Sequence, residues 1–143
     1  MSRLQIHFFT EDVSFNLKHK ISLRKWLKDT VEAEGYKLKE LNFVFCSDTY
    51  LLSINQQFLK HDTLTDIITF DNSDKFHVIV GDIFISLDRV RENALTFMAS
   101  EENELHRVMV HGTLHLLGYP DKGKSAKSIM TSKENYYLEK LIL

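Results

Sequence analysis

Cysteine is almost absent from this chain of 143 residues, since Cys46 is the single one. One cysteine cannot form a disulfide within the chain, and its place in the apolar run 43–46 predicts a buried thiol on a strand rather than a catalytic nucleophile. The sequence also lacks a run of about 20 apolar residues, which a membrane-spanning helix needs, and an apolar N-terminal leader. We therefore expect a cytoplasmic protein that stays reduced and has no membrane partner.

Proline and glycine are scarce as well. One proline and five glycines, with no repeat and no low-complexity linker, argue against a collagen-like, low-complexity or disordered chain. The 43% of hydrophobic residues predicts one globular domain over residues 1–143. A formal net charge of -2 argues against binding nucleic acid through overall charge, although a local basic face stays possible.

The hydrophobic periodicity predicts an α+β domain with a mixed sheet of about four strands and about five helices. Ser22, Ser47 or Asp48, Ser86 and Ser100 are the expected helix caps, and Gly81 suggests a bulge or a close approach within a strand. The expected strands are 4–9, 41–46, 65–70 and 76–86, and the expected helices are 22–34, 48–58, 86–100, 100–117 and 125–142.

The most informative segment is HGTLHLLGYPD at 111–121. His111 and His115 are four residues apart, which places both imidazoles on one face of a helix and near enough to share an ion. Gly118 can end that helix and Pro120 prevents it from resuming, so the chain turns and Asp121 can return as a third ligand. This spacing resembles zincin-type sites, and three protein ligands leave a fourth position for water.

Two other interpretations of the histidines stay open at this point. In an otherwise apolar helix they could be core histidines bonded to backbone groups, with no metal. A zinc peptidase is disfavoured, because its general-base glutamate would follow the first histidine, where this chain has Gly112. The glycine could instead admit another backbone or a substrate.

Several segments together resemble one family. HGTLHLLGY (111–119), NQQF (55–58), TDIITF (65–70) and GDIFIS (81–86) are similar, in order and spacing, to motifs of the YbeY family of rRNA-maturation endoribonucleases. The resemblance implies a zincin-like fold with a zinc ion at the end of a core helix. It also implies single-strand RNA hydrolysis in 16S rRNA 3′-end maturation and ribosome quality control, with rRNA and the small ribosomal subunit as partners.

The chain departs from the family pattern in two places. Asp121 stands where the family usually has a third histidine, and it remains a competent oxygen ligand for zinc. Leu59 stands where the family has an arginine thought to hold substrate phosphate, and Lys60 beside it offers a point charge without the bidentate fork of arginine.

The expected mechanism is hydrolysis by water whose pKa a metal ion lowers. Lys60 and Asp66 are the candidate catalytic residues, with Asp82 as an alternative to Asp66 for orienting water or a histidine. Lys122 and Lys124 follow the metal motif and are candidate contacts for substrate phosphates, although they could equally form a solvated surface.

Two functions of other classes compete with the nuclease. One is a non-catalytic ribosome-assembly factor whose metal is structural, which the missing arginine favours. The other is a zinc hydrolase acting on another substrate class, such as peptides or amides, which Gly112 argues against.

Overall fold

Four strands form one mixed sheet at the centre of the molecule, whose computed structural model describes residues 4–59 and 65–143. The strands are β1 (Ile6–Thr10), β2 (Lys37–Cys46), β3 (Ile67–Asp71) and β4 (Val78–Ser86). Their order is β1-β2-β4-β3, with β1, β2 and β4 parallel and the edge strand β3 antiparallel to β4. The expected α+β fold with a four-stranded mixed sheet is confirmed.

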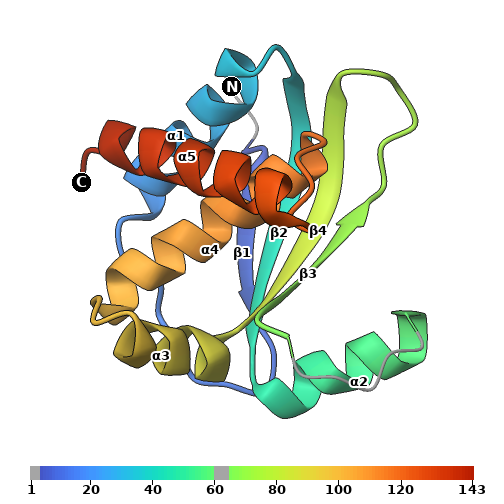
Figure 1. Cartoon of the computed structure of the whole chain (residues 1–143). Helices are drawn as coiled ribbons and strands as arrows, with labels where there is room; N and C mark the ends of the chain where they lie inside the picture. The colour runs from blue at the N-terminus through green and yellow to red at the C-terminus, as the bar shows by residue number, and fades with distance from the viewer. Residues whose placement is uncertain (1–3, 60–64) are drawn as a thin grey trace.

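Five helices surround the sheet within the described ranges (Figure 1). They are α1 (Lys20–Ala33), α2 (Asp48–Leu59), α3 (Leu87–Thr96), α4 (Glu101–Leu116) and α5 (Lys124–Lys140). None of the helices in those ranges is long and apolar enough to cross a bilayer.

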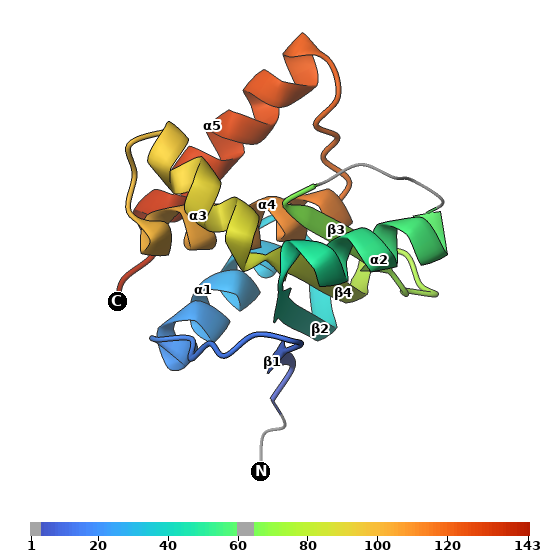
Figure 2. The same ribbon diagram turned by 90° about the horizontal axis from the view of Figure 1, so that it is seen from below.

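The helices divide between the two faces of the sheet because successive strand residues point to opposite sides. Phe43 and Ile83 pair across β2 and β4 and belong to the main core, into which α1, α4 and α5 also bury side chains. Cys46 and Ile68 face the other way and pack with Leu51 of α2 in a smaller cluster. Figure 2 accordingly shows α2 well apart from α1 and α5.

Two glycines allow α4 to lie close against the sheet. A Cβ atom on Gly112 would stand 2.6 Å from Cδ1 of Ile67 and 3.0 Å from Cγ2 of Ile83. A Cβ atom on Gly81 would stand 2.8 Å from Cδ1 of Leu116 and 2.9 Å from the carbonyl oxygen of Phe70. Gly81 is thus the expected close approach, and Gly112 admits isoleucine side chains of the sheet rather than a backbone or a substrate.

Three of the predicted helix caps are confirmed and one is wrong. The side-chain oxygens of Ser86 and Ser100 accept from the N–H groups of Arg89 and Asn103, and Ser47 rather than Asp48 caps α2. Helix α1, however, begins at Lys20 after His19, a left-handed residue (φ 63°) without a side-chain cap bond, so Ser22 lies inside the helix.

The ends of several elements also differ from the sequence prediction. Strand β2 begins at Lys37, four residues earlier than expected, because its polar first half pairs with β4 through a register shift between Leu38 and Glu40. Helix α3 ends at Thr96 rather than near Ser100, and the turn that follows it places Met98 at φ 55°.

Candidate metal centre

The end of α4 and the turn after it hold the predicted ligands. His111 and His115 lie on one face of α4, with ring centroids 4.8 Å apart. Gly118 adopts φ 100°, and the N–H groups of Gly118 and Tyr119 donate to the carbonyl oxygens of His115 and Leu114. These bonds close the helix end in a left-handed turn. The chain therefore reverses, and Asp121 comes back to the two histidines.

The three side chains meet at one point. Oδ2 of Asp121 lies 3.3 Å from Nε2 of His111 and 3.1 Å from Nε2 of His115. The three potential ligand atoms all lie within 4.8 Å of one another. Zinc bonds of about 2.0–2.1 Å in a tetrahedron put neighbouring ligand atoms about 3.3 Å apart, so the spacing fits such an ion. The side chains are 20%, 26% and 38% exposed, so this group of ligands is open to solvent.

Glu134 of α5 orients the first histidine. Its Oε2 atom lies 2.6 Å from Nδ1 of His111, and its Oε1 atom accepts from Nη1 of Arg107 at 2.8 Å. With its proton on Nδ1 directed at the carboxylate, His111 presents the lone pair of Nε2 towards Asp121 and His115. A carboxylate behind a histidine ligand is the usual support of a metal site, since it fixes the tautomer and the ring orientation.

The charges around the site act on its ionisable groups in opposite directions. Burial by itself lowers the pKa of His111, but the hydrogen bond and charge of Glu134, together with Asp66 and Asp121, raise it above the ordinary value. Burial by itself raises the pKa of Asp121, but the two imidazoles, His115 foremost, hold it below its usual range. The carboxylate of Asp121 is therefore ionised at neutral pH and can serve as an anionic ligand.

Asp66 and Asp82, the two candidate orienting carboxylates, lie in different places. Asp66 immediately precedes β3, and its Oδ2 atom is 3.5 Å from Nδ2 of Asn93. Burial raises the pKa of Asp66, and its carboxylate interacts electrostatically with His111. The carboxylate of Asp82 instead accepts from the amides of Asn42 and Asn72. The carboxylate that bonds the metal-site histidine His111 is therefore Glu134, whereas Asp66 or Asp82 was predicted for this role.

The basic residues proposed for substrate contact are only partly described. Lys60 lies outside the described residues. Lys122 and Lys124 are exposed directly after Asp121, and neither has an ion pair among the residues the structure describes. Both side chains are therefore accessible to an anionic ligand.

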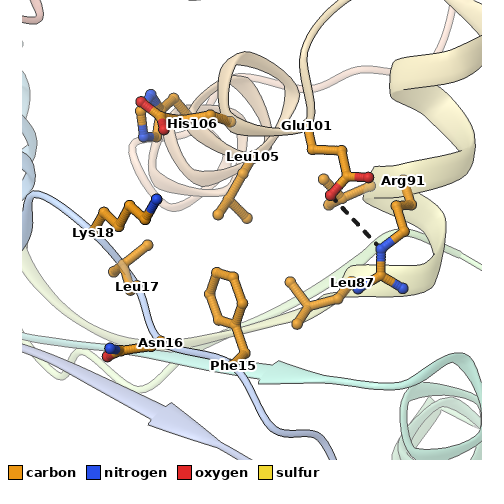
Figure 3. Close-up of a pocket in the computed structure, with 11 residues that line it drawn as sticks. Phe15, Asn16, Leu17, Lys18, Leu87, Arg91, Glu101, Leu105 and His106 are labelled. Carbon is orange, nitrogen blue, oxygen red and sulfur yellow. Dashed lines mark ion pairs between the residues drawn. The ribbon is translucent and has the colours of Figure 1, made fainter.

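A separate cavity lies away from this centre. It has a volume of about 250 Å³ between the 15–18 segment, α3 and the first half of α4. Figure 3 shows Lys18 and Leu105 on its wall and the ion pair between Arg91 and Glu101, whose atoms are 3.7 Å apart. None of the three candidate metal ligands lines this cavity.

Two groups that support the candidate metal centre were not predicted from the sequence. Glu134 lies in a polar stretch of α5, and Arg107 is a partly exposed charged residue of α4, so each would normally indicate a solvated position. The signal that could have found Glu134 is its burial, since its side chain is 9% exposed, but burial of a charged helix residue is visible only after α5 is placed against α4.

Comparisons with known proteins point to a single family. The family model described as "Endoribonuclease YbeY" matches residues 5–142. A protein named endoribonuclease YbeY from Cytophaga hutchinsonii is 49% identical over 135 residues, covering 94% of each chain. One of the same name from Flavobacterium psychrophilum is 46% identical, covering 92% of this chain and 93% of its own.

A solved structure has the same architecture. The solution structure of TM1509 from Thermotoga maritima superposes with a TM-score of 0.63 at 29% identity, and the match covers 95% of this chain and 88% of the other. The order of the motifs, the sheet with α4 against it, and the match over nearly the whole sequence lead to one conclusion: this chain belongs to the YbeY family of endoribonucleases.

Proposed function

We propose that this chain is a zinc-dependent endoribonuclease that hydrolyses phosphodiester bonds in single-stranded RNA. The observation that carries the proposal is the convergence of His111, His115 and Asp121 on one point with a side open to solvent. The family membership gives the substrate class. We further propose that the protein acts in the cytoplasm on the 3′ end of 16S rRNA, on the small ribosomal subunit, and in ribosome quality control.

Zinc is the proposed ion because two imidazole nitrogens and one carboxylate oxygen are a common ligand set for catalytic zinc. When bound, such an ion supplies a Lewis acid that lowers the pKa of a coordinated water molecule. The chain's own part is to hold the ligands in place. Glu134 keeps the Nδ1 proton of His111 directed away from the site, and Arg107 neutralises and fixes Glu134.

The remaining residues of the proposed site act on the substrate. We propose that Asp66 orients the attacking water. The electrostatic interaction between its buried carboxylate and His111 supports this role. Lys122 and Lys124 are proposed to hold substrate phosphates, which their exposure beside Asp121 supports. Lys60 is proposed to supply a further point charge in place of the family's arginine.

A specific observation favours the competing function, an assembly factor with a structural metal. Leu59 occupies the position of the phosphate-holding arginine, so one contact expected of the nuclease is missing. The third possibility, a zinc peptidase, is opposed by packing. The position of its glutamate is Gly112, where even a Cβ atom would come within 2.6 Å of Ile67.

The test is a cleavage assay with the zinc-loaded protein on end-labelled single-stranded RNA, duplex RNA and a peptide library. The proposal predicts cleavage of single-stranded RNA alone. It also predicts loss of that cleavage in Asp121→Ala and its retention in Asp71→Ala, which removes an exposed carboxylate of β3 that bonds only Ser73 among the described residues. A folded, zinc-loaded protein that leaves all RNA intact would support the assembly factor instead.

A further inference from the structure

A carboxylate at the far end of α1 is bonded to the turn that carries Asp121. Glu34 follows the last residue of α1, and its side chain is 11% exposed. Its Oε1 atom accepts from the hydroxyl of Tyr119 at 2.5 Å. Its Oε2 atom accepts from Nζ of Lys133 at 3.1 Å and from the hydroxyl of Tyr137. Two donors of α5 thus hold one oxygen of Glu34 and leave the other for the tyrosine of the turn.

Tyr119 lies two residues before Asp121, and Pro120 between them has a fixed φ angle. The turn is anchored at a second point, because the hydroxyl of Tyr36 donates to the carbonyl oxygen of Leu117 at 3.0 Å. With so few free dihedral angles between Tyr119 and Asp121, the position of the tyrosine ring and the direction of the aspartate are coupled.

The chemistry of Glu34 is unusual for a residue that only stabilises the fold. An acid at the C-terminal end of a helix meets the negative end of the helix dipole, which is unfavourable. Taking a carboxylate out of water costs further free energy that its partners must offset. Replacement by an apolar residue would avoid both costs, so the contact with the metal turn is the reason we assign to the carboxylate.

We propose that Glu34 is a positioning residue of the metal centre, which sets the place of Asp121 through its hydrogen bond to Tyr119. The inference rests on the proposed function only in requiring that Asp121 bind the ion. Glu34 contacts neither the ion nor the substrate in this account. Its effect is to reduce the freedom of the 117–121 turn before metal binds, so that Asp121 is already beside the two histidines.

The chain offers a matched pair of variants. Tyr119→Phe and Tyr137→Phe each remove one hydroxyl that donates to Glu34, but only Tyr119 belongs to the turn. Tyr137 is the more buried of the two, so its loss costs at least as much stability. Zinc affinity is measured by competition with a chromogenic chelator, at a temperature where thermal unfolding shows every variant fully folded. The d–d absorption of the cobalt-substituted proteins reports the ligand geometry.

Tyr119→Phe is expected to weaken zinc binding by about tenfold and to alter the cobalt spectrum, whereas Tyr137→Phe should leave both near the wild-type values. Glu34→Gln should match Tyr119→Phe, because an amide has one acceptor oxygen for which Lys133 and Tyr137 compete with Tyr119. The double variant should bind no more weakly than Glu34→Gln alone, since both changes break the same bond.

The outcomes separate this inference from the proposed function. If the wild-type protein binds zinc and both Glu34→Gln and Tyr119→Phe bind it as tightly as the wild type does, the role of Glu34 is overturned and the metal centre stands. If Tyr137→Phe and Tyr119→Phe weaken zinc binding equally, the effect reflects general stability. That result would also overturn the proposed role of Glu34. Wild-type protein that binds no zinc would overturn both.

Discussion

The Nδ1 atom of His111 lies 2.6 Å from the Oε2 atom of Glu134, although the two residues are 23 positions apart on different helices. Arg107 bonds the other oxygen of the same carboxylate. This chain of contacts joins α4 to α5 directly behind the metal centre. The packing of the last helix is therefore part of the construction of the site, and changes in α5 should reach the metal.

Replacing Glu134 should weaken metal binding. Glu134→Gln keeps an acceptor for Nδ1–H but loses the charge, and Glu134→Ala loses both, so we expect zinc affinity to fall by about tenfold and about a hundredfold, respectively. Calorimetric titration with zinc measures both values. Glu139→Gln, an exposed carboxylate on the same helix, is the matched control and should bind as the wild type does. Wild-type affinity in Glu134→Ala would exclude the orienting role.

Gly81→Ala should destabilise the protein because a methyl group at this position has no room between Leu116 of α4 and the backbone of β3. The new methyl group would meet the carbonyl oxygen of Phe70, which cannot move without disturbing the pairing of β3 with β4. We expect a loss of about 1–3 kcal/mol in the free energy of unfolding, measured with urea.

Gly112→Ala is the companion change on the facing helix. Its methyl group meets the ends of isoleucine side chains, and alanine gains about 1 kcal/mol over glycine in a helix, so the net loss should be smaller. If Gly81→Ala has the same free energy of unfolding as the wild type, then α4 does not pack against the sheet as closely as these distances indicate.

The contribution of Glu34 to stability should disappear in acid. Burial by itself raises the pKa of Glu34, but the hydrogen bonds of Tyr119, Tyr137 and Lys133 hold it below its ordinary value of 4.5. A group whose pKa is lower in the folded state stabilises it above the unfolded pKa and ceases to do so as the pH falls through the folded pKa. In the presence of chelator, the stability difference between wild type and Glu34→Gln should therefore shrink below about pH 4.5. A difference that stays constant from neutral pH to pH 3 would contradict this assignment.

Cys46 should be unreactive in the folded protein. Burial, reinforced by Asp12 and Asp48, raises the pKa of its thiol to about 12, so almost no thiolate is present at neutral pH. Alkylation by iodoacetamide, followed by mass spectrometry, should be slow for the native protein and complete after unfolding in guanidinium chloride. Rapid alkylation of the native protein would show that the outer face of β2 opens readily.

The parts of the site that could be predicted from the sequence are local. His111, His115 and Asp121 lie within one stretch of eleven residues, where helical spacing, Gly118 and Pro120 determine the geometry almost without reference to the rest of the fold. The structure brings the three side chains together as expected.

The supporting residues could not be predicted in the same way. Glu34 reaches Tyr119 across 85 positions, and Glu134 reaches His111 only because α5 folds back over α4. Such contacts depend on how helices pack, which periodicity does not specify. The start of β2 was missed for the same reason. The polar residues Lys37 and Lys39 do not indicate a strand by themselves, and the strand forms there through pairing with β4.

If His111, His115 and Asp121 together hold one metal ion, elemental analysis of the purified protein will detect that ion. We expect one zinc ion per chain in the wild type and loss of that zinc in folded His111→Ala and Asp121→Ala proteins. Zinc that remains at full occupancy in Asp121→Ala, or wild-type protein that takes up no metal at all, would contradict this expectation.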